Sequence, residues 1–318
     1  MRIAILDGNN NCFKSFAAMK ESRGGLLTNS VGVPTTCLFS MLRTLSDLVV
    51  RMKFDRIVVC WDVTGSYYRR EFFPLYKKHR KYVDMQDYFK ELDACRDHLE
   101  QLGVNQVIVK GIEADDLIGI IAHRLRPIHR VIIISDDKDF YQVVGEGIKI
   151  WRPIVNQFKT CDDVIEEYGS NYAKLLPRIK AITGEDGDFI PGVQDIDEKN
   201  MKLIKCGLGE KTAMKILGNK RLYEAIHIWK DNPKSKKQWG PLLLAKENQI
   251  MKSWKLARIR CKIEQYKNWE KKLLENIETK VLEEKKPSLK KVLRLKEFLE
   301  FKTINLVGVL KSLGINPQ

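Results

Sequence analysis

Short apolar stretches that end at acidic residues recur along the chain, with helical patterns between them. The stretches that read as buried strands span residues 2–6, 56–61, 104–109 and 131–135. Strands that alternate with helical patterns, such as 36–52 and 88–102, predict an α/β fold in which helices flank a central, mostly parallel sheet. Ligands of such sheets bind beyond the carboxyl ends of the strands, so a functional site is expected at that edge.

Acidic residues follow all four predicted strands and are expected to converge at this edge. They are Asp7, Asp62, Glu113, Asp115, Asp116, Asp137 and Asp139. Each one alone is explained as well by a helix cap or a turn. Four strand ends that all lead into acids make coincidence a poor explanation, and they favour one shared site.

The densest group of acids belongs to the motif Gly-Ile-Glu-Ala-Asp-Asp at residues 111–116, which opens an apolar helical pattern. A single acid in a first helical turn complements the helix dipole. Glu113, Asp115 and Asp116 are three acids within four positions, and their charges repel one another unless cations lie among them. A divalent-metal site is therefore the more specific hypothesis for this motif.

A basic and aromatic segment, residues 67–81, follows Asp62 along the chain. It contains six Lys or Arg residues with aromatic residues between them. Lys and Arg side chains hold phosphates and aromatic rings stack on bases, so the segment suits a nucleic acid. The alternative is a solvated basic loop with a few aromatic anchors.

Two glycine-containing stretches lie farther along the chain. Residues 184–193 (Gly-Glu-Asp-Gly-Asp-Phe-Ile-Pro-Gly-Val) add three acids, and residues 207–213 (Gly-Leu-Gly-Glu-Lys-Thr-Ala) open a predicted helix that runs to about Leu217. A Gly-x-Gly turn before a helix presents backbone N–H groups and the positive end of the helix dipole to a phosphate, with Lys211 and Lys215 alongside. A plain helix cap is the alternative.

The charge of the chain indicates an anionic partner. Its 318 residues carry a formal net charge of +15, and its pI is about 9.4. Residues 231–318 hold 21 Lys or Arg against 10 Asp or Glu, a net of +11, so most of the excess lies towards the C-terminus. Seven scattered cysteines without a Cys-x-x-Cys pair predict reduced thiols in the cytoplasm, and no signal peptide or membrane span is predicted.

Together these motifs resemble those of the 5′-nuclease family, which comprises flap endonucleases, the 5′-nuclease domain of bacterial DNA polymerase I and stand-alone phage or bacterial 5′-exonucleases. The similar stretches are residues 6–10, 28–35, 60–62, 69–80, 111–116, 135–142 and 207–213. The resemblance implies a PIN-like nuclease core at residues 1–180 with a helical arch at 67–90. It also implies a helix-turn-helix-like DNA clamp and a basic helical C-terminal region at 181–318.

The resemblance further implies a centre for two Mg²⁺ ions, which Mn²⁺ can replace, and allows for a K⁺ ion at the clamp. The ligands of the first group would be Asp7, Asp62, Glu113 and Asp115. The ligands that complete or form the second group would be Asp116, Asp137, Asp139, Glu185 and Asp188. The family usually has Asp at the position of Glu185, with Asp186 as a candidate substitute, and a small residue at Asp136, which is not assigned as a ligand.

The same resemblance implies roles for the arch and the clamp. Lys77 and Arg80 would be catalytic and would neutralise charge that develops on the phosphate, while Tyr76 would stack on a displaced base. The expected DNA contacts are Arg69, Arg70, Tyr76, Lys78, Gly207, Gly209, Lys211, Thr212 and Lys215. Residues 194–206 look like an insertion whose lysines would extend the DNA surface, namely Lys199, Lys202 and Lys205.

The implied function is a structure-specific 5′-nuclease, acting as a 5′-3′ exonuclease and flap endonuclease in the removal of flaps and RNA primers during replication or repair. Flapped, nicked or gapped DNA and RNA–DNA hybrids are the expected substrates of a monomer. Single-strand-binding protein, polymerase or sliding clamp are the expected protein partners, in the cytoplasm of a bacterium or phage-infected host. Two alternatives stay open: a PIN-like ribonuclease, and a branched-DNA-binding protein without activity.

Overall fold

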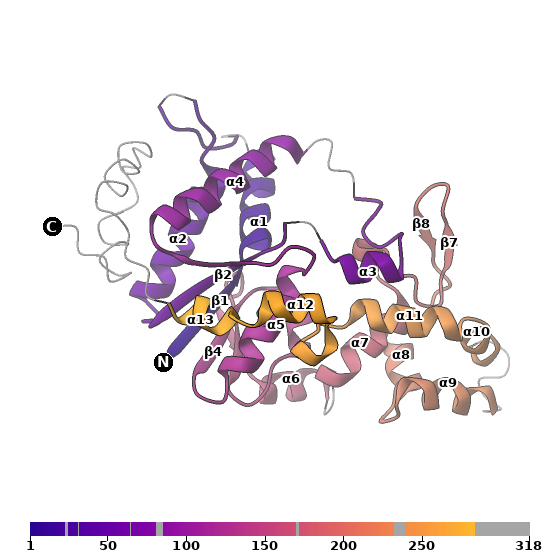
Figure 1. The fold of residues 1–318 in the computed structure, drawn as a ribbon. Helices are drawn as coiled ribbons and strands as arrows, with labels where there is room; N and C mark the ends of the chain where they lie inside the picture. The colour runs from indigo at the N-terminus through magenta and orange to yellow at the C-terminus, as the bar shows by residue number, and fades with distance from the viewer. Residues whose placement is uncertain are drawn as a thin grey trace.

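A six-stranded sheet forms the centre of the protein (Figure 1). The computed structural model describes residues 1–22, 25–30, 32–63, 65–80, 85–169, 172–231 and 239–283. The strands of the sheet are β1 (Arg2–Asp7), β2 (Arg56–Trp61), β3 (Asn105–Ile108), β4 (Arg130–Ile134), β5 (Ile148–Arg152) and β6 (Gln157–Lys159). Their order is β3-β2-β1-β4-β5-β6, and all neighbours are parallel except β5 and β6. The predicted α/β class and its four strands are confirmed.

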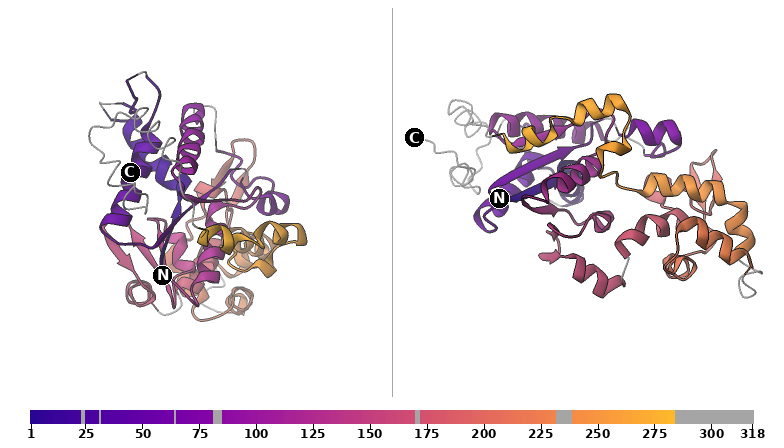
Figure 2. Two further views of the ribbon diagram at one scale, coloured as in Figure 1. Left: turned by 60° about the vertical axis from the view of Figure 1, so that its left-hand side comes forward. Right: turned by 60° about the horizontal axis from the view of Figure 1, so that its bottom comes forward.

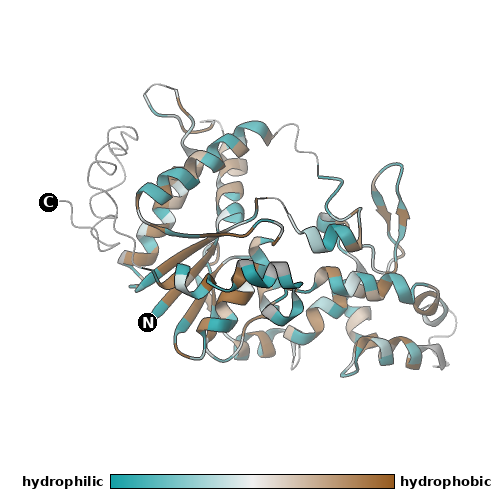
Figure 3. Ribbon diagram, in the orientation of Figure 1, coloured by the Kyte–Doolittle hydropathy of each residue, from teal (hydrophilic) through white to brown (hydrophobic). Residues whose placement is uncertain are grey.

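Side chains of the central strand alternate between two apolar cores, one on each face of the sheet. Ile3 and Ile5 pack in the core that includes α5 (Ala114–Leu125). Ala4 and Leu6 pack under three helices, α1 (Gly8–Lys20), α2 (Thr36–Val50) and α4 (Gln86–Gln101). All four side chains are at most 1% exposed, as expected for a parallel sheet covered on both faces, and the strands form the apolar centre of Figure 3.

The C-terminal half is mainly helical and lies beside the sheet (Figure 2). Its helices are α6 (Cys161–Tyr168), α7 (Tyr172–Thr183), α8 (Glu210–Leu217), α9 (Leu222–Asp231), α10 (Gly240–Ala245), α11 (Glu247–Ala257), α12 (Asn268–Leu274) and α13 (Ile277–Leu282). One continuous core contains Ile5 of the sheet and Ile250 of α11. Residue 180, the predicted boundary between the nuclease core and the C-terminal region, lies inside α7.

The last described helix brings the chain back to the edge of the sheet. In Figure 1, α12 and α13 run back from α11 towards the strands, and α13 packs against β3 and α5. Asn105 of β3 fixes this contact, because its amide nitrogen donates to the carbonyl oxygens of Val281 (2.8 Å) and Glu283 (3.0 Å). The C-terminal helices therefore take part in the core that supports the strands.

The expected arch at residues 67–90 is only partly helical in the described residues. It contains α3 (Tyr67–Phe72), turns over residues 74–79 and the first part of α4, while residues 81–84 lie outside the described residues. Residues 232–238 and 284–318 also lie outside the described residues, and they include much of the expected basic C-terminal region. Within the described ranges, none of the helices is long and apolar enough to cross a membrane.

The insertion predicted at residues 194–206 forms a β-hairpin. Its strands are β7 (Asp195–Asp197) and β8 (Lys202–Ile204), which pair antiparallel. The hairpin lies between the loop at 184–193 and α8, so it lengthens the connection of the expected clamp. Three short 3-10 helices complete the described structure, at Lys138–Gln142, Asp186–Asp188 and Ile263–Gln265.

Candidate active site

Two acids stand at the carboxyl ends of the central strands and are held by local hydrogen bonds. Asp7 ends β1 and caps α1, because its side chain accepts the N–H of Asn10 (2.9 Å). Asp62 follows β2 and accepts the N–H of Gly65 (2.7 Å). Asn9 ties the two strand ends together, since its amide donates to the carbonyl oxygen of Asp62 and accepts the N–H of that residue. The sequence analysis did not identify Asn9.

Two more acids complete this group. Asp137 follows β4, and its carboxylate accepts the N–H of Asp139 (2.8 Å) at the start of a 3-10 helix. Asp115 lies in the first turn of α5. We call Asp7, Asp62, Asp115 and Asp137 the unpaired acids, because none of them forms a salt bridge with a cation of the described residues.

The unpaired acids repel one another electrostatically. Burial raises the pKa of Asp7 to about 6, and the charges of Asp137 and Asp62 add to the effect, although the N–H of Asn10 opposes it. Burial also raises the pKa of Asp115 well above its ordinary value, with further contributions from Asp7 and Asp137. A cation placed among these side chains would relieve this repulsion.

Arg69 of α3 holds the neighbouring acids in place and is 3% exposed. Its Nη1 donates to Glu113 (2.6 Å), and both of its terminal nitrogens donate to Asp116 (2.7 and 2.9 Å). The two remaining hydrogen bonds go to the carbonyl oxygens of Leu256 (3.0 Å) and Arg258 (2.7 Å). These five bonds equal the five N–H donors of a guanidinium group.

This arrangement corrects two expectations. Arg69 was expected to contact DNA, but its donors are already committed inside the protein. Asp116 was expected to bind metal, but it is 1% exposed, pairs with both terminal nitrogens of Arg69 and accepts the backbone N–H of Arg260 (2.9 Å). Both residues therefore support the site from within the core.

Glu113 is shared between two cations at the border of the site. Burial alone would raise its pKa, but the ammonium of Lys77 and the guanidinium of Arg69 outweigh burial and lower the pKa of Glu113 to about 2. The Lys77 ammonium lies 2.7 Å from Glu113 and 3.4 Å from Asp188. The backbone of Lys77 has a φ of 54°, a sparsely populated region for a residue other than glycine, and its N–H donates to the carbonyl oxygen of Asp188.

A second group of acids, Asp139, Glu185 and Asp188, is paired with cations. Lys180 of α7 lies between the first two, with salt bridges to Asp139 and to Glu185 (2.9 Å). Arg80 pairs with Asp188 at 2.6 Å. Burial raises the pKa of Glu185 to about 7, although the Lys180 ammonium opposes the rise.

The sequence analysis missed Lys180, although its position four residues before the glycine of the 184–193 motif places it on the last turn of α7. Asp186, the candidate substitute for Glu185, is exposed and pairs instead with Lys205 (2.7 Å). Asp136, which was not assigned as a ligand, forms salt bridges with Lys14 (3.6 Å) and Arg152 (3.8 Å).

No three Asp, Glu, His or Cys side chains within the described ranges lie close enough together to hold a metal ion as they stand. The donor chemistry nevertheless fits a hard divalent cation, because the unpaired acids offer only carboxylate oxygens. Burial, with added repulsion from neighbouring carboxylates, raises the pKa values of Asp7, Asp62 and Asp115, and nearby cations offset this rise only in part. The second group offers the same donors, but there a cation would have to displace Lys180 or Arg80.

The other residues expected to contact DNA lie on two surfaces. Arg70 and Lys78 are exposed near the acids. Tyr76 was expected to stack on a base, but it is 3% exposed, and its hydroxyl donates to Asp188 (3.0 Å). In this conformation Tyr76 positions Asp188, and its ring is covered by Ile190 and Leu256.

At the position of the expected clamp, the glycine turn precedes a helix, as the sequence predicts. Gly209 is the N-cap residue of α8, and Gly207 has a φ of 85°, which favours glycine. Apart from each glycine and its neighbours in the chain, no atom of the described residues lies within 4 Å of the position that a Cβ atom would take on Gly207 or Gly209. Lys211 and Lys215 are exposed on α8, and Thr212 is half-buried. Backbone N–H groups at the start of this helix are thus accessible to an anion.

Sequence comparison finds known proteins that are similar to this chain. A family model described as 5′-3′ exonuclease, N-terminal resolvase-like domain, matches residues 2–169. A 5′-3′ exonuclease of Bacillus subtilis is 28% identical over 270 residues, which cover 82% of this chain and 84% of that protein. A DNA polymerase I of Caldicellulosiruptor bescii is 28% identical over 325 residues, or 99% of this chain, but the chain covers only 34% of that polymerase.

Solved structures show the same fold at lower sequence identity. T5 5′-exonuclease with bound divalent metal ions (zinc) superposes with a TM-score of 0.70 at 19% identity, covering 89% of this chain and 99% of that one. Flap endonuclease-1 from Methanococcus jannaschii superposes with a TM-score of 0.53 at 15% identity, covering 98% and 90% of the two chains.

The substitution Arg69→Met is expected to lower the free energy of unfolding by about 3–5 kcal/mol, because it leaves the buried Asp116 without its cation and Glu113 with only one of its two. Arg43→Met is the charge-matched control at an exposed position on α2, with an expected change within about 0.5 kcal/mol. Urea denaturation of both variants measures the difference. Equal effects would show that Arg69 does not hold the fold together.

The substitution Asp7→Asn is expected to stabilise the protein in EDTA at about pH 7. The pKa of Asp7 is about 6 when folded, against an ordinary 3.8. The folded state therefore binds more protons between these values, and the free energy of unfolding falls as the pH rises through them. Asparagine keeps the cap of α1 without the charge.

Thermal denaturation of both proteins at about pH 4 and about pH 7 tests this expectation. The variant should gain about 2 kcal/mol relative to wild type at the higher pH and little at the lower pH. The same difference at both pH values would mean that the charge of Asp7 is not the cause.

Proposed function

The chain belongs to the 5′-3′ exonuclease family, and from this membership we propose that it is a structure-specific 5′-nuclease that hydrolyses phosphodiester bonds in branched DNA and RNA–DNA hybrids. The observation that carries the proposal is the group of unpaired acids at the carboxyl edge of the sheet, with Lys77 and Arg80 beside it. Such an edge combines anionic ligands for a divalent cation with cations for a phosphate. The DNA polymerase I relatives support a role in removing flaps or RNA primers, in the cytoplasm of a bacterium or phage-infected host.

The unpaired acids are the residues that would hold the first divalent ion, with Glu113 at their border. Oxygen-only ligands favour Mg²⁺, with Mn²⁺ as a substitute. When bound, such ions polarise the phosphate and lower the pKa of a coordinated water, which makes hydroxide available near neutral pH. Asp139, Glu185 and Asp188 would hold a second ion once Lys180 and Arg80 have moved aside.

Lys77 and Arg80 supply positive charge beside the acids. Their side chains pair with Glu113 and Asp188 in the described structure. When a divalent ion compensates these acids, the two side chains become available to a phosphate and stabilise negative charge that develops on it. The left-handed backbone of Lys77 fixes the direction from which its side chain approaches.

The start of α8 is the second contact in the proposal. Backbone N–H groups around Gly209 and the side chains of Lys211 and Lys215 suit the phosphates of a duplex. Contacts of this kind read backbone shape and not base sequence, which agrees with structure-specific recognition. A K⁺ ion at this turn is part of the proposal.

Cleavage of a labelled 5′-flap duplex in Mg²⁺ or EDTA tests the activity, beside a blunt duplex and a single-stranded RNA of matched length. Cutting near the flap junction that depends on Mg²⁺ is the expected result. Preference for the single-stranded RNA would instead identify a PIN-like ribonuclease, and flap binding without cutting would identify a binding protein.

The substitution Asp137→Asn is expected to lower the rate of flap cleavage by about a hundredfold or more, because it removes a charged ligand of the divalent ion. Asp136→Asn is the matched control, since Asp136 precedes it in sequence but pairs with Lys14 and Arg152. The rates are measured with saturating substrate, and flap binding in EDTA checks that both variants fold. A large loss of cleavage rate in the Asp136→Asn variant alone would mean that Asp136, and not Asp137, is the ligand of the divalent ion.

The substitution Lys211→Ala is expected to weaken duplex binding and to reduce the slope of log affinity against log salt by about one unit, as for the loss of a single phosphate contact. Lys149→Ala, at an exposed position on β5, is the control and should leave the slope unchanged. Fluorescence anisotropy at several salt concentrations measures both. A slope unaffected by Lys211→Ala would place the duplex elsewhere.

A further inference from the structure

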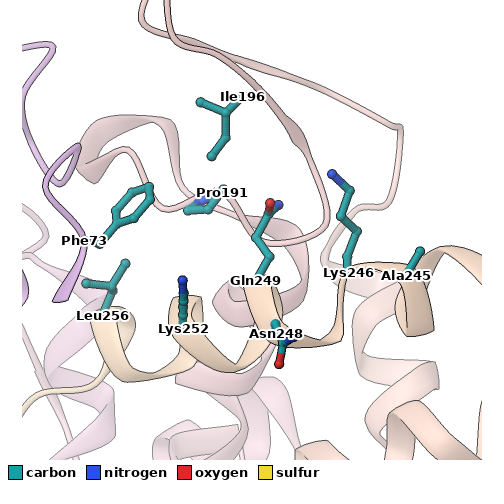
Figure 4. Close-up of a pocket in the computed structure, with 9 residues that line it drawn as sticks. All are labelled: Phe73, Pro191, Ile196, Ala245, Lys246, Asn248, Gln249, Lys252 and Leu256. Carbon is teal, nitrogen blue, oxygen red and sulfur yellow. The ribbon is translucent and has the colours of Figure 1, made fainter.

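A cavity of about 380 Å³ lies between the hairpin, α11 and the end of α3. Figure 4 shows the residues that surround it. Its apolar walls are Phe73, Pro191, Ile196 and Leu256, and lysine and amide side chains of α11 complete its border. The volume lies within the usual range for sites that bind small molecules or single groups of a larger ligand.

The shape of this cavity is fixed by hydrogen bonds between α11 and the loop that follows Pro191. Gln249 donates to the carbonyl oxygens of Gly192 (2.8 Å) and Gln194 (2.6 Å). Ser253 accepts the backbone N–H of Gly192 (3.0 Å) and is fully buried. The walls are therefore formed before any ligand arrives, so binding would cost little ordering of the protein.

Lys252 provides the charge of the cavity. Its ammonium points towards the space between Phe73 and Pro191 (Figure 4). Lys246, the other lysine of the border, is paired with Asp195 of the hairpin. Lys252 is exposed and forms no salt bridge or hydrogen bond with the described residues. The site thus combines one available cation with an aromatic ring and an apolar wall.

The position of the cavity connects it to the candidate active site. Phe73 and Leu256, which line it, pack in one cluster with Tyr76 and Ile190. The hydroxyl of Tyr76 donates to Asp188 on the other side of this cluster. One tyrosine side chain therefore lies between the cavity and an acid of the candidate active site, so the cavity adjoins the edge at which a strand would bind.

We propose that the cavity binds one unstacked nucleotide of a single strand, with its base against Phe73 and Pro191 and its phosphate at Lys252. This inference rests on the proposed function, because it assumes a nucleic-acid strand at the neighbouring acids. The partner chemistry follows from the lining, since aromatic rings stack on any base and a lysine neutralises one phosphate. An acidic peptide would use the same charge, but nothing beside the cavity leads a peptide to it.

Binding of a fluorescent single-stranded oligodeoxynucleotide in EDTA tests the site without cleavage. Phe73→Leu keeps an apolar side chain in the cluster, and both it and Lys252→Gln are expected to weaken binding about fivefold or more. For Lys252→Gln, the slope of log affinity against log salt should also fall by about 0.7. Lys149→Gln on β5 is the charge-matched control and should bind as wild type. Binding of a blunt duplex by all variants should be unchanged.

Photocrosslinking with a single strand that contains 5-iodouracil locates the base directly. Peptide mapping is expected to find the crosslink at Phe73, and Phe73→Leu should remove it. No crosslink at Phe73, together with unchanged affinity of both variants, would overturn the assignment.

Flap cleavage by the wild-type protein separates the two proposals. Mg²⁺-dependent cleavage without a crosslink at Phe73, and with unchanged affinity of both variants, would reject only the nucleotide site. A crosslink at Phe73 without any cleavage would reject only the nuclease activity and would keep the nucleotide site.

Discussion

The buried guanidinium of Arg69 is the interaction on which the arrangement of this protein depends. A buried charge is tolerated only when it is paired and its donors are satisfied, and Arg69 of α3 reaches partners on two distant parts of the chain. It joins α3 to the acids of α5 and to the backbone at the end of α11, and its bond to Leu256 spans 187 residues of sequence. The basic segment, the sheet edge and the C-terminal helices are thereby held in one geometry.

This pairing divides the acids of the edge into two kinds. Asp115 and Asp116 are neighbours in sequence, yet a helix turns by about 100° from one residue to the next. Asp116 therefore faces Arg69 in the core, while Asp115 faces Asp7 and Asp137. Burial and the charges of neighbouring acids raise the pKa values of Asp7 and Asp115, so leaving these acids without cations costs stability. The paired acids contribute stability at other points of the same edge.

Three surfaces around the edge suit different parts of one nucleic-acid substrate. The acids with Lys77 and Arg80 suit the phosphate of the phosphodiester bond to be hydrolysed. The start of α8 suits the backbone of a duplex, and the cavity beside Phe73 suits an unpaired base. They come from distant parts of the chain but share supporting elements, because α11 packs against α7 and lines the cavity. The hairpin at β7 and β8 gives this chain a wall that a shorter connection would not supply.

The sequence by itself determined the α/β class, the positions of four strands, the acids at their carboxyl ends and the glycine turn before α8. These features are local, since strand periodicity, helix capping and turn chemistry are set by residues close together in the chain. The tertiary structure decided that Arg69 and Asp116 are internal supports, that Lys180 lies between Asp139 and Glu185, and that Tyr76 is covered. Only folding decides which side chains meet when they are tens to hundreds of residues apart, because burial and the pairing of charge depend on those contacts.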